Sequence, residues 1–411
     1  MNVLNIEVNH EVNTDKFIES IEKHVAEAAE DLKKLALDIH ANPELGHQEF
    51  KAYQWQVELM NKYGFEVEEH YLDIPTSYKA VYKNKEGKPG LKIAMLAEYD
   101  ALPDIGHACG HNLISMVGNG SGIAIRHIVD ELGGEVHVIG TPAEETAGAK
   151  VAMSRAGAFK EYDAVMMAHP METSASSLNT SAMYARKIEF FGRTSHAAAA
   201  PEEGVNALDA MINFFNLVNA LRQQTKDDAR IHGIITHGGS AANVIPEYTS
   251  ALFYIRAHKV AYVEELVKKI TACAEGAAVG TGCTVKVSKT EEDFKDTHSN
   301  MYLNELACQD MEKFGVEIAR MGEMTIGGSS DLGDVSYDCP AIQLCCGMGH
   351  DGSGHPYAPH TVEFEKMACS ESALNTALCF IKGFALTAAE LMSNAKHMEA
   401  IKAEFAEMEQ V

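Results

Sequence analysis

Apolar residues recur every three or four positions over several stretches of the chain, and this spacing predicts amphipathic helices. In residues 17–40 the series is Ile18, Ile21, Val25, Ala28, Leu32, Leu35 and Ile39. The same kind of pattern predicts further helices over 49–63, 113–132, 149–156, 206–223, 261–274, 300–314 and 370–392. A charged tail follows the last of them.

Shorter runs that are continuously apolar, or that alternate with polar residues, predict strands. These runs cover 65–71, 78–83, 91–96, 135–140, 164–168, 185–191, 231–236, 248–257, 284–289 and 341–345. Up to about residue 181 the strands alternate with helices, which is typical of an open α/β sheet with its site along the carboxyl edge.

The pattern changes near residue 181. From there to residue 294 the order becomes strand, helix, strand, strand, helix, strand, which is typical of a ferredoxin-like α+β domain. After Asp296 the α/β pattern returns. The sequence therefore predicts an α/β protein with a mixed-sheet catalytic domain, 1–181 and 295–411, interrupted by an inserted domain at 182–294.

Composition narrows the functional class. The chain has 411 residues and a formal net charge of -25, and that length favours two domains over one. Because nucleic acid and anionic membranes are also negative, this charge argues against both as partners and favours a small-molecule substrate. The longest apolar stretches fall short of the roughly 20 residues of a membrane span. Residues 1–15 lack the pattern of a secretory signal.

Nine cysteines are spaced irregularly along the chain. Adjacent Cys345 and Cys346 could not readily form a normal disulfide with each other. We therefore expect buried thiols in a reducing cytoplasm rather than a disulfide framework. Cys109 is an exception because acids and imidazoles surround it in the sequence.

Side chains that bind metals gather in four segments, three of which follow the ends of separate predicted strands. After strand 91–96 the candidates are Glu98, Asp100, His107, Cys109 and His111. Glu144 and Glu145 follow strand 135–140, His169 follows strand 164–168, and His350, His355 and His360 lie in a late loop. Because parallel strands end at one edge of a sheet, these segments are expected to converge. Carboxylate, thiolate and imidazole together predict a metal site.

Each of these signals has an ordinary alternative when it is taken alone. A pair of glutamates is commonly a solvated helix start, an isolated histidine is commonly a surface or core residue, and a lone cysteine is commonly a packed thiol. The coincidence of the four segments is what favours the metal site.

The motifs also resemble, in their order along most of the chain, the M20 family of metallopeptidases and amidohydrolases. The likeness is to its aminoacylase-like branch, which includes N-acyl-amino-acid amidohydrolases and aminobenzoyl-glutamate hydrolases. The matching segments are Asp100-Ala101-Leu102-Pro103, Gly106-His107-Ala108-Cys109-Gly110-His111-Asn112, Thr141-Pro142-Ala143-Glu144-Glu145, Ala168-His169-Pro170, Gly192-Arg193-Thr194-Ser195-His196-Ala197, Asn243-Val244-Ile245-Pro246 and Pro359-His360-Thr361-Val362-Glu363-Phe364.

This resemblance implies a site for two divalent metal ions, zinc or manganese, with cobalt as a further candidate. The implied ligands are Cys109, His111, Glu145, His169 and His360. Cys109 would bridge the ions or bind one of them. Glu144 would be the general base, which takes a proton from water and gives it to the leaving nitrogen. Asp100 would orient a ligand, while His350 and His355 would be loop or substrate residues.

For the inserted domain, the resemblance implies dimerisation and a contribution to the active site of the neighbouring subunit. His196 would donate a hydrogen bond to the oxyanion, and Asn243 and Arg256 would hold the substrate, Arg256 through a carboxylate. Their ordinary alternatives are a loop histidine, a turn former and an exposed strand residue. The segment Gly327-Gly328-Ser329-Ser330-Asp331 resembles a glycine-rich segment beside the family's site, with a plain loop as the alternative.

Two departures from the family pattern bear on the metal. Asn112 stands where the family usually has an aspartate, and Glu98-Tyr99-Asp100 stands where many relatives have His-x-Asp. The expected function is cleavage of the amide bond of N-acyl amino acids or related conjugates by a homodimer or higher homo-oligomer. The alternatives are a metallo-dipeptidase or aminopeptidase of the same fold, and a metal-binding scaffold that has lost catalysis, against which the presence of Glu144 argues.

Overall fold

The computed structural model describes residues 6–8, 13, 15–322 and 324–408 and resolves two compact units. The first unit comprises Met1–Asn179, Thr297–Met324 and Asp334–Val411, and the second comprises Thr180–Asp296 and Thr325–Gly333. Thr325–Gly333 therefore differs from the sequence-based boundary, which put it in the catalytic domain. It joins the second unit because the Arg256 guanidinium donates to the Gly327 carbonyl and the Ser329 hydroxyl.

The first unit is built on a six-stranded mixed sheet in the order β1-β2-β4-β3-β5-β12. Its strands are β1 (Glu66–Glu69), β2 (Tyr78–Lys83), β3 (Lys92–Ala97), β4 (Glu135–Gly140), β5 (Ala164–Met171) and β12 (Ala341–Gly347). Strands β4, β3, β5 and β12 run parallel to one another, and β2 runs antiparallel to both of its neighbours, β1 and β4. The mixed sheet is confirmed, and the four parallel strands end at one edge.

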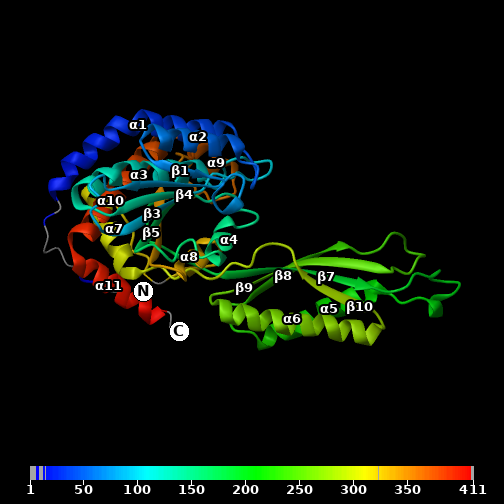
Figure 1. Ribbon diagram of the computed structural model, residues 1–411. Helices are drawn as coiled ribbons and strands as arrows, with labels where there is room; N and C mark the ends of the chain where they lie inside the picture. The colour runs from blue at the N-terminus through cyan, green and yellow to red at the C-terminus, as the bar shows by residue number, and fades with distance from the viewer. Residues whose placement is uncertain (1–5, 9–12, 14, 323, 409–411) are drawn as a thin grey trace. The chain divides into compact units, whose positions relative to one another are not determined.

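Helices cover this sheet. They are α1 (Ile18–Ala41), α2 (Phe50–Lys62), α3 (His111–Leu132), α4 (Ala149–Arg155), α7 (Met301–Lys313), α9 (Val362–Met367), α10 (Glu371–Ser393) and α11 (Ala395–Met408). Helix α3 packs on β3, β4 and β5, and α10 packs on α3 (Figure 1). Glycines in α3 permit this approach, because a Cβ at Gly118 would lie 2.4 Å from the Leu96 carbonyl and one at Gly120 would lie 2.4 Å from Ile381.

Helix α10 occupies nearly its predicted range, 371–393 against 370–392, but it corrects the expectation that every apolar stretch is too short for a membrane span. By length and composition it could cross a membrane, but 67% of its most apolar stretch is buried inside the fold. Its fully buried side chains include Phe380, Ile381 and Phe384. A central helix of a folded core accounts for this apolar surface.

The second unit has the ferredoxin-like arrangement that the element order predicts. Its elements are β7 (Ala182–Phe191), α5 (Ala207–Leu221), β8 (Arg230–His237), β9 (Tyr248–Ala257), α6 (Val260–Thr281) and β10 (Thr284–Lys289). The antiparallel sheet has the order β10-β7-β9-β8. Helices α5 and α6 lie along one face of it (Figure 1). Phe190, Phe214 and Phe253 fill the space between the sheet and the helices.

Short elements complete the chain. They are the strands β6 (Asn179–Thr180) and β11 (Thr325–Ile326), the helix α8 (Leu332–Ser336), and the 3-10 helices η1 (Asp15–Phe17), η2 (Tyr71–Asp73), η3 (Pro201–Glu203) and η4 (Arg222–Gln224).

Three local predictions were wrong. The charged tail is the helix α11, which forms because Met398 and Ile401 bury a face against the first unit. Helix α6 continues to Thr281 rather than ending at 274. Strand β5 extends to Met171, because every residue of β12 pairs with it and Gly347 lies opposite Met171. His169 therefore lies within the strand and not after it.

Asp310 in α7 supplies a test of the packing between α7 and α10. It is fully buried, accepts a hydrogen bond from the Thr387 hydroxyl at 3.0 Å, and lies 3.3 Å from the Lys313 ammonium. Burial raises the pKa of Asp310 to about 7. Because an unfolded aspartate titrates near about 3.9, the ionised group destabilises the fold increasingly as pH rises from about 4 to 7.

We therefore expect Asp310→Asn to be more stable than the wild type by about 1–3 kcal/mol at pH 8, where the carboxyl is ionised. This advantage should be largely gone near pH 4, where the carboxyl is protonated in the folded state and about half protonated in the unfolded state. Urea unfolding at the two pH values measures the difference. An equal effect at both would contradict the assignment.

Candidate metal centre

The candidate ligands sit where the parallel strands of the first unit end. The loop after β3 carries Cys109 and ends at Gly110, whose φ of 74° lets His111 begin α3. A side chain at Gly110 would also collide with Pro170, which follows His169 in β5. The loop and strand β5 are thus brought into contact by a residue that has no side chain.

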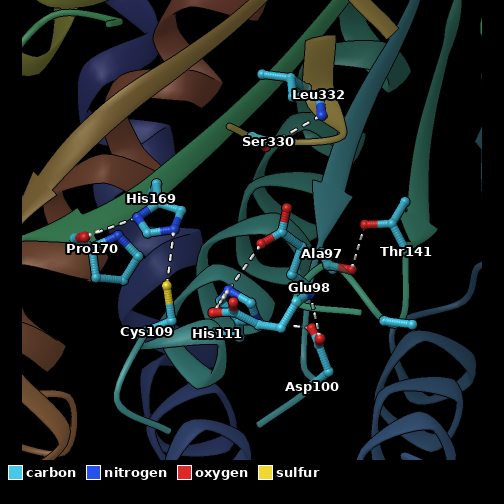
Figure 2. Close-up of polar contacts among 12 residues, drawn as sticks. Ala97, Glu98, Asp100, Cys109, His111, Thr141, His169, Pro170, Ser330 and Leu332 are labelled. Carbon is cyan, nitrogen blue, oxygen red and sulfur yellow. Dashed lines mark hydrogen bonds and ion pairs between the residues drawn. The ribbon is translucent and has the colours of Figure 1, made fainter. Parts of the chain in front are cut away.

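Donor atoms from four segments of the chain converge at this edge. The Cys109 Sγ lies 3.5 Å from His169 Nε2 (Figure 2). The Glu145 Oε1 lies 3.2 Å from His360 Nε2 and 3.9 Å from His111 Nε2. Cys109, His111 and His169 form one group of donors within 4.8 Å of one another, and Cys109, Glu145 and His360 form another. The two groups share the Cys109 sulfur.

Asp100 orients two of these residues at once. Its Oδ1 lies 2.8 Å from His111 Nδ1, and its Oδ2 accepts the backbone N–H of Glu145 at 2.9 Å. A proton on His111 Nδ1 leaves the Nε2 lone pair directed into the site, where Figure 2 shows the ring between Asp100 and Glu98. His169 is arranged in the same way, with Nδ1 2.9 Å from the Pro170 carbonyl. Such contacts fix the tautomer that a metal requires.

The two glutamates are delivered by a tight turn after β4. Ala143 has φ 60°, a conformation unusual for a residue with a side chain. Its carbonyl accepts the N–H groups of Thr146, Ala147 and Gly148. Glu144 lies in a group with His111 and Glu145 whose donor atoms are within 4.8 Å of one another. His360 also has a positive φ, of 67°.

The residues fit a divalent metal on two observations. First, His111 Nε2 and Glu145 Oε1 are buried and make no hydrogen bond of suitable geometry, which is costly unless a cation binds them. Second, burial and then the Glu145 carboxylate raise the pKa of the Cys109 thiol well above its usual range. A thiolate here therefore needs a cation, and thiolate, imidazole and carboxylate are the usual ligands of zinc.

The remaining candidates of the first unit lie around this centre or outside it. Glu98 is fully buried and bonded through Oε1 to the Lys150 ammonium at 2.7 Å, while its Oε2 lies 3.4 Å from His111 Nε2. His107 is buried beside His40. His350 and His355 lie in an exposed loop, where His350 Nδ1 is 2.9 Å from Glu172.

Asn112, the departure from the family's aspartate, has a structural place. Its amide donates to the Ala368 carbonyl at 2.8 Å and to the Ala36 carbonyl at 3.3 Å. The side chain therefore ties the start of α3 to α1 and to the end of α9.

His196, Asn243 and Arg256 belong to the second unit, and the structure describes their contacts within that unit. His196 Nδ1 accepts the N–H groups of Ala198 and Ala199 at 3.2 and 3.1 Å. Its proton therefore lies on Nε2, which is exposed as a donor. The Asn243 carbonyl accepts the Ala197 N–H. Arg256 contacts Gly327 and Ser329 of the glycine-rich segment.

Two buried charged residues beside the centre were missed from the sequence. Glu49 accepts the N–H of Ala143, and Lys150 pairs with Glu98. Neither belongs to a motif of ligand spacing, and each reads in the sequence as an ordinary polar residue near a helix start.

Comparison with known proteins identifies the family. Residues 183–281 match the model of the M20 peptidase dimerisation domain. Over 399 residues, 93% of this chain and 90% of the relative, the chain is 35% identical to the Xaa-Arg dipeptidase of Mus musculus. The chain belongs to the M20 family.

Two further proteins extend the comparison. Over 274 residues, 61% of this chain and 56% of the relative, it is 32% identical to a subunit of the p-aminobenzoyl-glutamate hydrolase of Escherichia coli. A dinuclear metal-binding M20 peptidase from Bacillus subtilis has the same fold, with a TM-score of 0.65, 20% identity, and coverage of 87% of this chain and 97% of its own. The M20 chain is accordingly a hydrolase of amide or peptide bonds, as the resemblance predicted.

Cys109→Ser tests the donor that both groups share. We expect the variant to bind at least one metal ion about 10-fold or more weakly, because a hydroxyl stays protonated and binds zinc poorly. Elemental analysis after dialysis against a weak chelator measures the loss. Cys273→Ser, which changes a half-buried thiol of α6, should retain full metal content. Unchanged stoichiometry in Cys109→Ser would reject the thiol as a ligand.

Proposed function

We propose that this M20 chain is a dinuclear metal-dependent amidohydrolase that cleaves the amide bond of N-acyl amino acids or related conjugates. The observation that carries the proposal is the convergence of two donor groups on Cys109, with Glu144 beside them. One group would hold one ion through Cys109, His111 and His169, and the other a second ion through Cys109, Glu145 and His360. Zinc or manganese fits these donors, with cobalt as a further candidate.

The bound ions would supply Lewis-acid polarisation of the scissile carbonyl and a nucleophilic water at neutral pH. The chain's own residues would manage the protons. The Glu144 carboxylate would take a proton from the attacking water and return it to the leaving nitrogen. Asp100 would keep the His111 ring and the Glu145 backbone in place during both transfers.

His196 is suited to the oxyanion. Because Nδ1 already accepts two backbone N–H groups, Nε2 carries the proton and would donate it in a hydrogen bond to the developing negative oxygen. We propose that His196 acts on the neighbouring subunit's substrate, with Asn243 and Arg256 as further substrate contacts. Arg256 already holds the glycine-rich segment, and its remaining donors would serve a carboxylate.

A dipeptidase is the second candidate. It is favoured by the mouse relative, a Xaa-Arg dipeptidase aligned over 93% of this chain. A dipeptide and an N-acyl amino acid share the scissile amide and the terminal carboxylate, so the same groups serve either. They differ in the free α-amine of the dipeptide.

We also propose self-association in the cytoplasm. Strand β8 is paired with β9 on one side only, and no strand of the described residues pairs with its other edge. Ile234 and Ile235 on β8 are 64% and 43% exposed. An exposed apolar edge strand favours pairing with a second copy.

The state of the cysteines supports the proposed cytoplasmic location. All nine cysteines are free thiols, which suits a reducing compartment.

Glu144→Ala tests the catalytic role. With zinc, manganese or cobalt supplied, the wild type should hydrolyse members of a panel of N-acyl amino acids and dipeptides. The variant should lose about 10²–10⁴-fold in kcat, the usual contribution of a general base, and keep its metal content. If both proteins were inactive across the whole panel, the proposed amidohydrolase activity would be rejected. If both were equally active, Glu144 would be rejected as the general base.

Ile234→Asp tests self-association through β8. A charge on the apolar edge should shift the chain from dimer to monomer in sedimentation velocity, because pairing would bury the carboxylate. Val279→Asp, which changes an 84% exposed residue of α6, is the matched control and should leave the dimer intact. A dimer that survives Ile234→Asp unchanged would place the interface elsewhere.

A further inference from the structure

Glu49 is a buried acid that the chemistry described above does not use. It directly precedes α2 and its side chain is fully buried. One carboxylate oxygen accepts the Thr76 hydroxyl at 2.9 Å, and the other accepts the Ala143 N–H, also at 2.9 Å. Both oxygens are therefore occupied, and one of them holds the residue that precedes Glu144.

The backbone on both sides of Glu144 is held by a buried carboxylate. On the preceding side, Glu49 binds the N–H of Ala143, and on the following side, Asp100 binds the N–H of Glu145. Ala143 has φ 60° and its carbonyl is satisfied within the turn. That conformation is disfavoured for alanine, and the Ala143 N–H forms its hydrogen bond with Glu49.

The loop that carries Glu49 is itself packed on the site. Gly46 lies so close to the turn that a Cβ there would be 2.9 Å from the Ala143 Cβ. The Glu44 carbonyl accepts the N–H of Ala101, directly after Asp100. The segment from Glu44 to Glu49 thus connects the Asp100 loop with the Glu144 turn.

We propose that Glu49 is a positioning residue, which sets the direction of the Glu144 carboxylate by holding the Ala143 N–H. The proposal rests on the proposed role of Glu144. Burial, with the nearby Asp100 charge, raises the pKa of Glu49 to about 7, so the fold maintains this acid at a cost. A residue needed only to fill space or to cap α2 would not require a buried carboxyl, and Glu49 makes no side-chain cap of that helix.

The test compares Glu49→Ala with Glu49→Gln in the metal-loaded full chain. Glu49→Ala removes the acceptor and should lower kcat by about 30- to 100-fold, with KM changed by less than about 3-fold, because the base is misplaced and not lost. Glu49→Gln keeps an acceptor oxygen of the same shape and should restore kcat to within about 5-fold of the wild type. Metal content should be unchanged in both.

Glu44→Ala is the matched control. Glu44 is a carboxylate of the same loop, and its Oε2 accepts the N–H groups of Lys51 and Ala52 at the start of α2. Its loss should lower thermal stability through the missing helix cap but leave kcat unchanged. A structural effect of the loop would reduce kcat in Glu44→Ala and Glu49→Ala alike, which would overturn the proposal.

Hydrogen exchange separates this proposal from the proposed function. In Glu49→Ala, the peptide covering 141–148 should exchange faster than in the wild type, whether or not a substrate has been found. If the wild type is inactive but this peptide exchanges faster in Glu49→Ala, the proposed function fails. The role of Glu49 in holding the Ala143 N–H would then still be supported. Three results would overturn the proposal. The first is unchanged exchange in this peptide, and the second is a folded Glu49→Ala whose kcat stays within about 3-fold of the wild-type value. The third is a Glu49→Gln variant whose kcat falls as far as that of Glu49→Ala.

If Glu49→Ala does not fold, Thr76→Val carries the test. It removes the hydroxyl that holds the other oxygen of Glu49 and keeps the side-chain shape. We expect about a 3- to 10-fold fall in kcat with faster exchange in 141–148. Wild-type values of both would overturn the proposal.

Discussion

The site depends on the burial of donor atoms whose bonding the chain itself leaves incomplete. His111 Nε2 and Glu145 Oε1 are out of contact with water and make no hydrogen bond of suitable geometry. Around them lie the carboxyls of Glu98 and Asp100, both buried, and a thiol whose ionisation burial opposes. Burying such a cluster in a low-dielectric interior is unfavourable, and divalent cations bound to these donors would offset that cost.

The scaffold serves this constraint. Three parallel strands bring their ends to one edge of the sheet. Contacts with neighbouring segments hold the loops that carry the candidate metal ligands. Gly110 allows the Cys109 loop to lie against Pro170, and the Ala143 turn is tied by hydrogen bonds on both sides of Glu144. Ala143, which precedes Glu144, and His360 both have positive φ values, a conformation that is disfavoured for residues with a side chain.

Periodicity was enough to predict most of this fold, because each element buries one face. The ferredoxin-like domain follows from the order of its strands and helices. The motifs were enough to predict that Cys109, His111, Glu145, His169 and His360 lie together, and their roles as ligands stay a prediction. Glu49 and Lys150 were beyond that reasoning, because their roles depend on partners about 50 to 95 positions away in the chain. Likewise, α11 looked like a charged tail because its buried face has only a few apolar residues.

The proposed function requires two divalent ions at the site where two donor groups converge on Cys109, and it requires that hydrolysis depend on both ions. The sharpest test is a titration of the metal-free full chain with zinc or manganese, followed by metal analysis and by hydrolysis of the best panel substrate. We expect two ions bound per chain, with activity rising as the second site fills. Full activity with a single ion, or no ion retained by a folded chain, would contradict this.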